Sequence, residues 1–317
     1  MVISMSSIDD YKDKIVQGNT LEVLKKLPSE SIDTIITSPP YWGLRDYGIE
    51  GQIGLEPTLE EYIEKLLQIT AELKRVLKPS GVMWWNHNDS YGGSGKGRGS
   101  GKWIEMSKNL YYEGLHPKPN KDIPPKCLAL QNYRLILRMV DEQGWTLRNI
   151  VIWYKPNHMP SSVKDRLTNA YEPVFMLVKN RKYYFDLDAI RVPHSKAGIE
   201  RAKYALTKFG SDKNNPLGRL GKGITSGAEP THVELNPLGK NPGDMWSIPT
   251  QPFPEAHFAT FPERLVQPMI EASCPQWICK KCGKARQRIT KVEYLDKEGK
   301  KIIPNNKNKW ENDIERY

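Results

Sequence analysis

The chain has 317 residues, enough to bury one large core or two smaller ones. Its formal net charge of +10 and pI near 9.2 favour a polyanionic partner, although a basic surface without any such partner gives the same composition. No apolar run is long enough to cross a bilayer and no signal-peptide pattern is present, so we expect a soluble, cytoplasmic protein.

The first predicted elements are a short strand over residues 14–19 and a helix over residues 21–27. The strand ends in the turn Gly18-Asn19, and Thr20 is the expected N-cap of the helix because acidic and apolar residues follow in its first turn.

The next element is an apolar strand over residues 32–37, which the tetrad Ser38-Pro39-Pro40-Tyr41 ends and Trp42 follows. The carboxyl end of a parallel strand is where open α/β sheets bind their ligands. Two consecutive prolines carry carbonyls but no N–H groups, so this strand end is rich in acceptors and has a flat ring beside it. The combination suits a planar base whose exocyclic amine must give up a proton.

Helices and buried strands then alternate. Apolar residues at helical spacing predict helices over residues 59–77 and 128–142, and apolar runs predict strands over 82–85, 147–154 and 172–179. This alternation predicts an α/β fold, with a mostly parallel or mixed sheet covered on both faces.

The periodicity vanishes between residues 195 and 245, where Gly and Pro are frequent, which indicates a loop-rich insertion. A helix over residues 263–272 follows. Beyond it, Cys279 and Cys282 have the spacing of a zinc knuckle, and Cys274 is the candidate third ligand of a half zinc ribbon. A closed site needs a fourth ligand, either His257 or a residue from outside.

Residues 37–42 closely resemble motif IV of the DNA amino-methyltransferases, which methylate N4 of cytosine or N6 of adenine with S-adenosylmethionine. A tetrad headed by Ser is more typical of the N4-cytosine enzymes. The later elements resemble motifs IV to VIII, and residues 257–262 resemble motif X, in the order of the permuted, or beta, class. The resemblance implies a partial Rossmann-like sheet, mostly parallel with an antiparallel strand, and double-stranded DNA as the partner.

The resemblance also implies roles for single residues. Ser38 and the Pro39 carbonyl would accept hydrogen bonds from the target amine, Pro40 completes the strand end, and Tyr41 would stack on a flipped base. The candidate cofactor contacts are Gly18, Asn19, Phe258, Thr260, Phe261 and Pro262, and the candidate DNA contacts are Trp42, Arg45, Lys96, Arg98 and Lys102. For Trp42 a place in the core is an equally open alternative.

The glycine-rich motif I, Asp-Pro-Phe-x-Gly-Ser-Gly in this class, is missing from the chain, which contains no F-x-G-x-G. The glycine-rich residues 92–101 fit neither G-x-G-x-x-G nor the P-loop pattern. Without the motif I strand, residues 32–37 would form an unpaired apolar edge. We therefore expect motif I to come from a separate polypeptide or a swapped copy, or to have been lost by truncation.

These observations predict four segments: 1–194 as the catalytic half, 195–250 as the target-recognition insertion, 251–273 as the motif X segment, and 274–317 as a basic tail resembling part of a zinc ribbon. The predicted activity is methylation of N4 of cytosine. The alternatives are an N6-adenine enzyme, a catalytically silent DNA-binding subunit or remnant, and a methyltransferase for RNA or protein side chains. A cytosine-C5 enzyme is disfavoured because Cys127 follows Lys126 rather than Pro, and we expect Cys127 to be a buried small hydrophobe.

Overall fold

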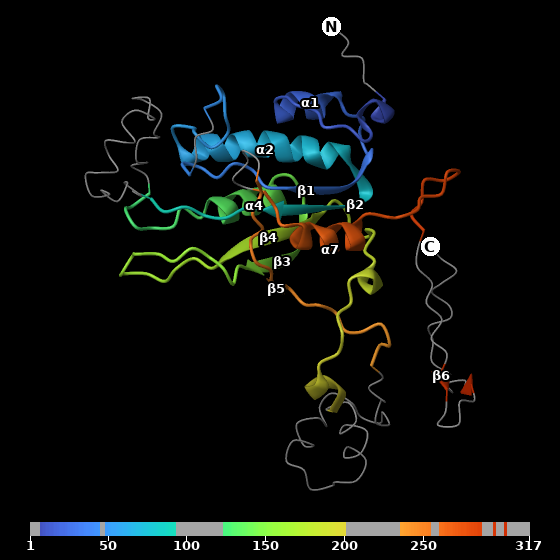
Figure 1. Cartoon of the computed structure of the whole chain (residues 1–317). Helices are drawn as coiled ribbons and strands as arrows, with labels where there is room; N and C mark the ends of the chain where they lie inside the picture. The colour runs from blue at the N-terminus through green and yellow to red at the C-terminus, as the bar shows by residue number, and fades with distance from the viewer. Residues whose placement is uncertain are drawn as a thin grey trace, which may run out of the picture. The chain divides into compact units, whose positions relative to one another are not determined.

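The structure is a computed structural model. It describes residues 7–44, 48–92, 123–200, 235–254 and 260–286, together with the backbone of residues 294–295 and 301–302. The chain divides into two compact units, residues 1–276 and 277–317, and each is described by itself. The first unit contains a five-stranded sheet and its covering helices (Figure 1).

The sheet has the strand order β1-β2-β4-β3-β5. Its strands are β1 (Ile32–Thr37), β2 (Leu77–Asn86), β3 (Thr146–Tyr154), β4 (Tyr171–Val178) and β5 (Met245–Ser247). β1 runs parallel to β2 and β3 parallel to β5, while β4 is antiparallel to both of its neighbours. The expected mixed sheet is confirmed. Its consequence is that β1, β2, β3 and β5 end at the same edge at which β4 begins.

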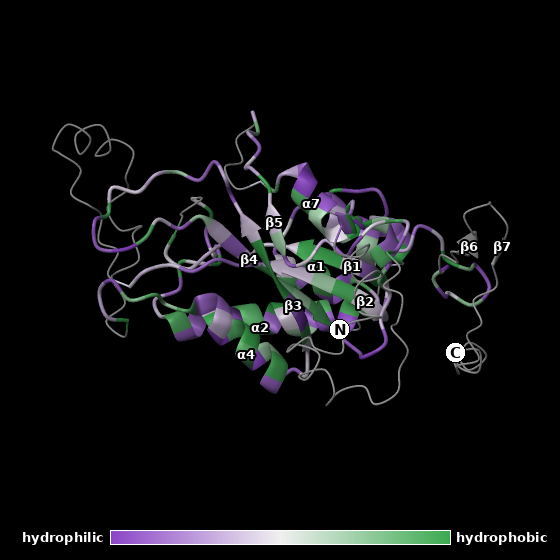
Figure 2. Cartoon of the chain, turned by 90° about the horizontal axis from the view of Figure 1, so that it is seen from below, coloured by the Kyte–Doolittle hydropathy of each residue, from purple (hydrophilic) through white to green (hydrophobic). Residues whose placement is uncertain are grey.

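Helices cover both faces of this sheet because alternate residues of its strands point to opposite sides. The helices are α1 (Thr20–Lys26), α2 (Leu59–Val76), α4 (Gln131–Asp141) and α7 (Glu263–Ser273), with short 3-10 turns at Ile8–Tyr11 and Leu187–Ala189. On β2, Met83 and Trp85 join the buried cluster of α1, α2 and α4, whereas Val82 and Trp84 join the cluster of α7. Figure 2 shows the apolar central strands between helices that carry hydrophilic residues on their outer faces.

Several predicted boundaries shift. Residues 14–19 do not form a strand, and Ile15 is fully exposed. Asn19, rather than Thr20, caps α1, because its Oδ1 accepts from the N–H groups of Leu21 and Glu22 at 3.0 and 3.4 Å. The helix predicted over 128–142 begins only at Gln131, because Leu130 has a left-handed backbone with φ 54°.

Two strands differ more strongly from expectation. β2 begins at Leu77, so the residue expected to end the preceding helix already belongs to the sheet, five residues before the predicted start of this strand at residue 82. β5 lies within the stretch predicted as a loop-rich insertion, and it adds the outermost strand beside β3. Residues 201–234, the middle of that insertion, lie outside the described residues.

β1 lies at the other edge of the sheet, as expected, and β2 is its neighbour among the described residues. Every residue of β1 is half-buried. α7 packs near it through Thr34, whose hydroxyl donates to the carbonyl of Ser273 at 2.7 Å. The strand is therefore covered on its faces, and within the described part of the chain no second strand pairs with its outer edge.

The second unit begins at Trp277, three residues after the predicted start of the tail. Here Cys279 and Gly283 close a tight turn: the N–H of Gly283 donates to the carbonyl of Cys279, and the N–H of Cys279 donates to that of Lys284, both at 2.9 Å. Further on, β6 (Tyr294–Leu295) pairs with β7 (Lys301–Ile302) in antiparallel fashion.

Candidate active site

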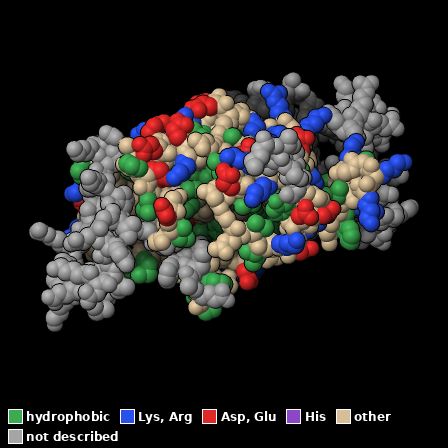
Figure 3. Space-filling model, turned by 90° about the horizontal axis from the view of Figure 1, so that it is seen from above, with side chains coloured by type: hydrophobic (Ala, Val, Ile, Leu, Met, Phe, Trp, Pro, Cys, Tyr) green, Lys and Arg blue, Asp and Glu red, His purple; other side chains and the backbone are tan. Residues whose placement is uncertain are grey.

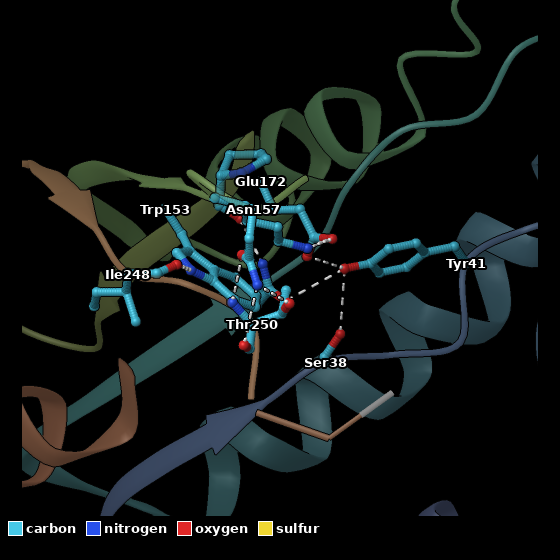
Figure 4. Close-up of polar contacts among 10 residues, drawn as sticks. Ser38, Tyr41, Trp153, Asn157, Glu172, Ile248 and Thr250 are labelled. Atoms are coloured by element: carbon cyan, nitrogen blue, oxygen red, sulfur yellow. Dashed lines mark hydrogen bonds and ion pairs between the residues drawn. The ribbon is translucent and has the colours of Figure 1, made fainter. Parts of the chain in front are cut away.

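The carboxyl edge of the sheet gathers polar side chains from strands that are far apart in the sequence. Ser38 and Tyr41 follow β1, Asn86 ends β2, and Glu172 lies at the start of β4 (Figure 4). Lys155 directly follows β3. The topology therefore brings the predicted tetrad into contact with residues that its own sequence neighbourhood does not contain.

The phenol of Tyr41 is the centre of this group. Its single O–H proton is shared between two acceptors, Glu172 Oε2 at 3.0 Å and Asn86 Oδ1 at 3.3 Å, and its oxygen receives a long hydrogen bond of 3.5 Å from Ser38 Oγ. Burial, and next the charge of Glu172, raise the pKa of the Tyr41 phenol well above its usual value. Tyr41 therefore stays protonated at neutral pH and acts as a hydrogen-bond donor.

The two proline carbonyls of the tetrad differ in their partners. The Pro40 carbonyl accepts from the Tyr62 hydroxyl at 2.8 Å. The Pro39 carbonyl receives no hydrogen bond within the described part of the chain, although Pro39 is buried. A buried acceptor without a donor is unfavourable, so this carbonyl is suited to a donor from a ligand.

His87 supports the tetrad from below. The imidazole is fully buried, and this burial lowers its pKa to about 3, so it is neutral at physiological pH. Its Nε2 lies 3.1 Å from the Tyr62 hydroxyl, and its Nδ1 lies 3.4 Å from Trp85 Nε1. Because the indole can only donate, Nδ1 accepts and Nε2 carries the proton.

The same imidazole stacks on Tyr41, with ring centroids 5.4 Å apart and an interplanar angle of 30°. One face of the tyrosine ring is thus covered by protein. Gly54 packs behind the tetrad, and a Cβ there would lie 3.1 Å from the Tyr41 carbonyl while its φ of +100° already disfavours other residues.

Glu172 and Lys155 were not predicted from the sequence. They form an ion pair in which both side chains are largely buried, and the Lys155 ammonium also lies 4.1 Å from the centroid of the Trp153 ring. The pairing arises because Trp153 is in register with Glu172 across β3 and β4. The only local signal was a charged residue at each of two strand ends.

The segments that follow β3 and β5 are also tied together at this edge (Figure 4). Asn157 Nδ2 donates to Thr250 Oγ1 at 2.9 Å, and the Thr250 N–H donates back to Asn157 Oδ1 at 2.9 Å. The Trp153 indole donates to the Ile248 carbonyl at 2.8 Å. These contacts fix the start of the long β3–β4 connection.

Two expectations for single residues need correction. Trp42 is only 6% exposed and its indole donates to the Glu56 carbonyl at 2.9 Å, so it is a core residue and not a platform for DNA. Cys127 is exposed and precedes α4 instead of lying inside it, so it is not the buried hydrophobe expected from the sequence.

The candidate cofactor and DNA contacts are resolved only in part. Asn19 uses its side-chain oxygen to cap α1, while Phe261 packs against the cluster of α7 and Pro262 is the N-cap of α7, directly after Thr260. Arg45, Lys96, Arg98, Lys102 and Phe258 lie outside the described residues.

The predicted zinc site is not supported. Among the described residues no group of three or more His, Cys, Asp or Glu side chains is arranged to hold a metal ion. Hydrogen bonds from the backbone of Cys282 and Lys281 lower the pKa of the Cys279 thiol, whereas burial raises the pKa of the Cys274 thiol. None of the described helices is long and apolar enough to span a membrane.

The helical face beside α2 has a mixed charge, as Figure 3 shows, with acidic and basic side chains intermingled. A hollow of about 680 Å³ on this side is lined by Glu50, Glu56, Glu60, Glu61 and Glu64, with Lys65 as its basic residue. Lys65 pairs with Glu56, and Arg138 pairs with Glu60 and Glu64, so the lining is partly neutralised, but its excess of carboxylates disfavours phosphates.

Residues 32–277 match the DNA methylase family of N6 and N4 methyltransferases. The chain belongs to this family. The match covers the five strands of the sheet, the tetrad and α7.

Curated relatives agree with the family. The chain is 36% identical to the Type II methyltransferase M.Cfr9I of Citrobacter freundii over 82% of this chain and 72% of the relative, and 34% identical to M.SmaI of Serratia marcescens over 80% and 73%. Among solved structures, the cytosine-N4-specific PvuII DNA methyltransferase matches with 17% identity and a TM-score of 0.46, over 81% of this chain and 68% of that one.

Proposed function

We propose that the chain transfers a methyl group from S-adenosylmethionine to N4 of a cytosine flipped out of double-stranded DNA, as the modification enzyme of a prokaryotic or phage-encoded Type II restriction–modification system. The observation that carries the proposal is the pair of acceptors at the end of β1. Ser38 Oγ and the Pro39 carbonyl are adjacent in the chain, and the second has no donor among the described residues.

These acceptors fit the chemistry of an exocyclic amine. The lone pair of the cytosine amine is delocalised into the ring, so the nitrogen is a weak nucleophile. Hydrogen bonds from its two N–H groups to Ser38 Oγ and the Pro39 carbonyl pull the nitrogen toward tetrahedral geometry and return the lone pair to it. The contribution of the protein is thus orientation and polarisation.

Tyr41 provides the surface for the base. His87 covers one face of its ring, and Glu172 and Asn86 hold its hydroxyl, so the ring is fixed in place before a base arrives. A flipped base stacks on such an aromatic side chain because unpaired bases lose their own stacking partners.

S-adenosylmethionine supplies a methyl group on a positively charged sulfur. The described residues fit this cofactor only in part, because no glycine-rich loop lies next to β1 and the sequence has no F-x-G-x-G. We therefore assign to this chain only the handling of the base, with Thr260 to Pro262 near the start of α7 as the candidate cofactor contacts that are described.

We expect duplex DNA to acquire N4-methylcytosine when it is incubated with labelled S-adenosylmethionine and the chain completed by a segment that supplies the glycine-rich loop. Mass spectrometry of the digested nucleosides identifies the methylated base. If N6-methyladenine were the only product, the target base would be adenine and not cytosine. If label appeared only in RNA, the proposed DNA substrate would be wrong. No incorporation into any nucleic acid by the completed enzyme would favour the silent DNA-binding subunit.

The absence of motif I from this sequence bears on whether the chain works with a second polypeptide segment. Among the described strands β1 has a neighbour on one side only, and Ile15, which is fully exposed, and Val16, which is also exposed, precede it in the chain. Apolar strand edges without a neighbour are avoided in finished folds. We propose that a polypeptide segment outside these 317 residues pairs with β1 and carries the glycine-rich loop. A swapped copy does not supply it, because this sequence lacks the loop.

The isolated 317-residue chain is then expected to bind DNA but to give no measurable heat with S-adenosylmethionine in titration calorimetry. Adding a segment with Asp-Pro-Phe-x-Gly-Ser-Gly, in trans or by fusion, is expected to restore cofactor binding. A folded monomer on size-exclusion chromatography that binds the cofactor alone would contradict this proposal and leave the base-handling role in place.

A further inference from the structure

The connection between β3 and β4, residues 155–170, forms an arm that leaves the sheet at the edge of the tetrad. Its base is closed by the Lys155 N–H, which donates to the Ala170 carbonyl at 2.8 Å. Figure 1 shows the arm as an extended stretch beyond the ends of β3 and β4. Because Lys155 is paired with Glu172, and Glu172 holds Tyr41, the arm starts directly beside the candidate base site.

The arm is held in place at several points. Asn157 is fastened to Thr250, Asp165 forms an ion pair of 2.5 Å with Lys126, and the Arg166 guanidinium lies 4.2 Å from the centroid of the Tyr91 ring. Pro156 and Pro160 restrict its backbone further. An arm so constrained loses little conformational entropy when it meets a partner.

Two large apolar side chains of this arm lie in water. Met159 is 84% exposed and Leu167 is 90% exposed, although the arm is fastened on both sides of them. Single exposed apolar residues are ordinary, but two on one constrained arm beside a base-handling site point to an apolar ligand surface. Lys164 and Arg166 accompany them, and the acidic residue of the arm, Asp165, is neutralised by Lys126.

We propose that the arm enters duplex DNA beside the target and that Leu167, with Met159, fills the space that the flipped base leaves in the stack. Flipping a base costs its pairing and stacking, and Leu and Met are among the apolar side chains that proteins insert between base steps. Lys164 and Arg166 lie between Met159 and Leu167 in the chain, and in this proposal they contact the phosphates of the same duplex. The inference rests on the proposed function, since it requires a base to be flipped.

The test compares the wild-type protein, in the preparation that methylates DNA, with Leu167→Ala, Met159→Ala and the double variant. Two duplexes carry the mapped recognition site, one fully paired and one with an abasic position opposite the target, which lowers the cost of flipping. Leu137→Ala on α4 is the matched control, because this leucine is 62% exposed and lies outside residues 155–170.

On the paired duplex the double variant is expected to methylate about tenfold more slowly than the wild type, because that factor corresponds to the loss of one well-buried aliphatic contact. The control is expected to keep the wild-type rate. On the duplex with the abasic position the deficit should shrink to less than about threefold, because less flipping cost remains to be offset. This difference between the two duplexes distinguishes side chains that fill the space of the flipped base from side chains that merely contact DNA.

Equal deficits on both duplexes, or no deficit with an active wild type, would overturn this inference and leave the proposed function intact. A change in oligomeric state of Leu167→Ala on size-exclusion chromatography would show that a second copy covers the arm, which also overturns it. Absence of methylation by the wild type on either duplex would count against the proposed function itself.

Discussion

Replacing Ser38 by Ala is expected to lower kcat by about 10²–10³-fold while the affinity for DNA stays within about threefold of the wild type. The hydroxyl is one of the two acceptors assigned to the target amine, and its contribution grows as the nitrogen becomes tetrahedral. Its neighbours in the structure do not depend on it, because Tyr41 keeps Glu172 and Asn86 as partners when the 3.5 Å bond from Ser38 is lost. Single-turnover methylation and a separate DNA-binding titration measure the two quantities.

Ser31→Ala is the matched control for this variant. Ser31 immediately precedes β1 at the opposite edge of the sheet, and its hydroxyl donates to the Pro28 carbonyl at 2.8 Å. It should therefore reproduce any effect on folding of the strand without touching the base site. If Ser38→Ala turned over DNA at the rate of Ser31→Ala, the hydroxyl would have no part in polarising the amine.

The parts of the fold that the sequence predicts are those set by local patterns. β1 has the predicted bounds because an apolar run rich in β-branched residues stops at two prolines that cannot continue a ladder. α2 follows its apolar spacing to within one residue, and α7 begins where predicted, directly after Pro262. Each of these signals lies within the element itself.

The predictions that were wrong concern residues whose structure depends on contacts with residues distant in the sequence. Ile15 and Val16 look like strand residues, but a strand forms only where another strand accepts its hydrogen bonds, and the described sheet ends at β1. β5 is three residues long and exists because β3 offers it an edge. Trp42 follows the tetrad in sequence, yet it is buried, because its N–H donates to Gln131 Oε1 and its indole donates to the Glu56 carbonyl, both on later segments of the chain.

The candidate site divides in the same way. The tetrad is contiguous, so its chemistry can be derived from the sequence and from its resemblance to a family motif. Glu172 and Lys155 meet through the register of β3 against β4, which no local pattern encodes, and their contact with Tyr41 requires the strand order as well. Glu172 and Lys155, which position Tyr41, therefore could not be predicted from the sequence, whereas the tetrad could.

Glu172→Gln is expected to lower kcat about tenfold to hundredfold with little change in DNA affinity. The Tyr41 hydroxyl would lose a charged acceptor, a hydrogen bond worth about 1.5–3 kcal/mol, and the ring that receives the base would be held less firmly. Gln preserves the shape of the side chain, so a loss of activity reports the charge. Steady-state kcat and KM on duplex DNA, with a thermal melt of each variant, measure the effect.

Two double variants distinguish two possible roles of Glu172: positioning Tyr41, or only neutralising the charge of Lys155. In a Tyr41→Phe background, Glu172→Gln should cause little further loss of kcat if Glu172 acts through the phenol hydroxyl, because that hydroxyl is already absent. Lys155→Met removes the ammonium that Glu172→Gln leaves partly buried and unpaired. Recovery of wild-type kcat in Glu172→Gln with Lys155→Met would mean that charge balance alone is at stake. Recovery of the melting temperature without recovery of kcat is the expected result, because the tyrosine ring would still lack its anchor.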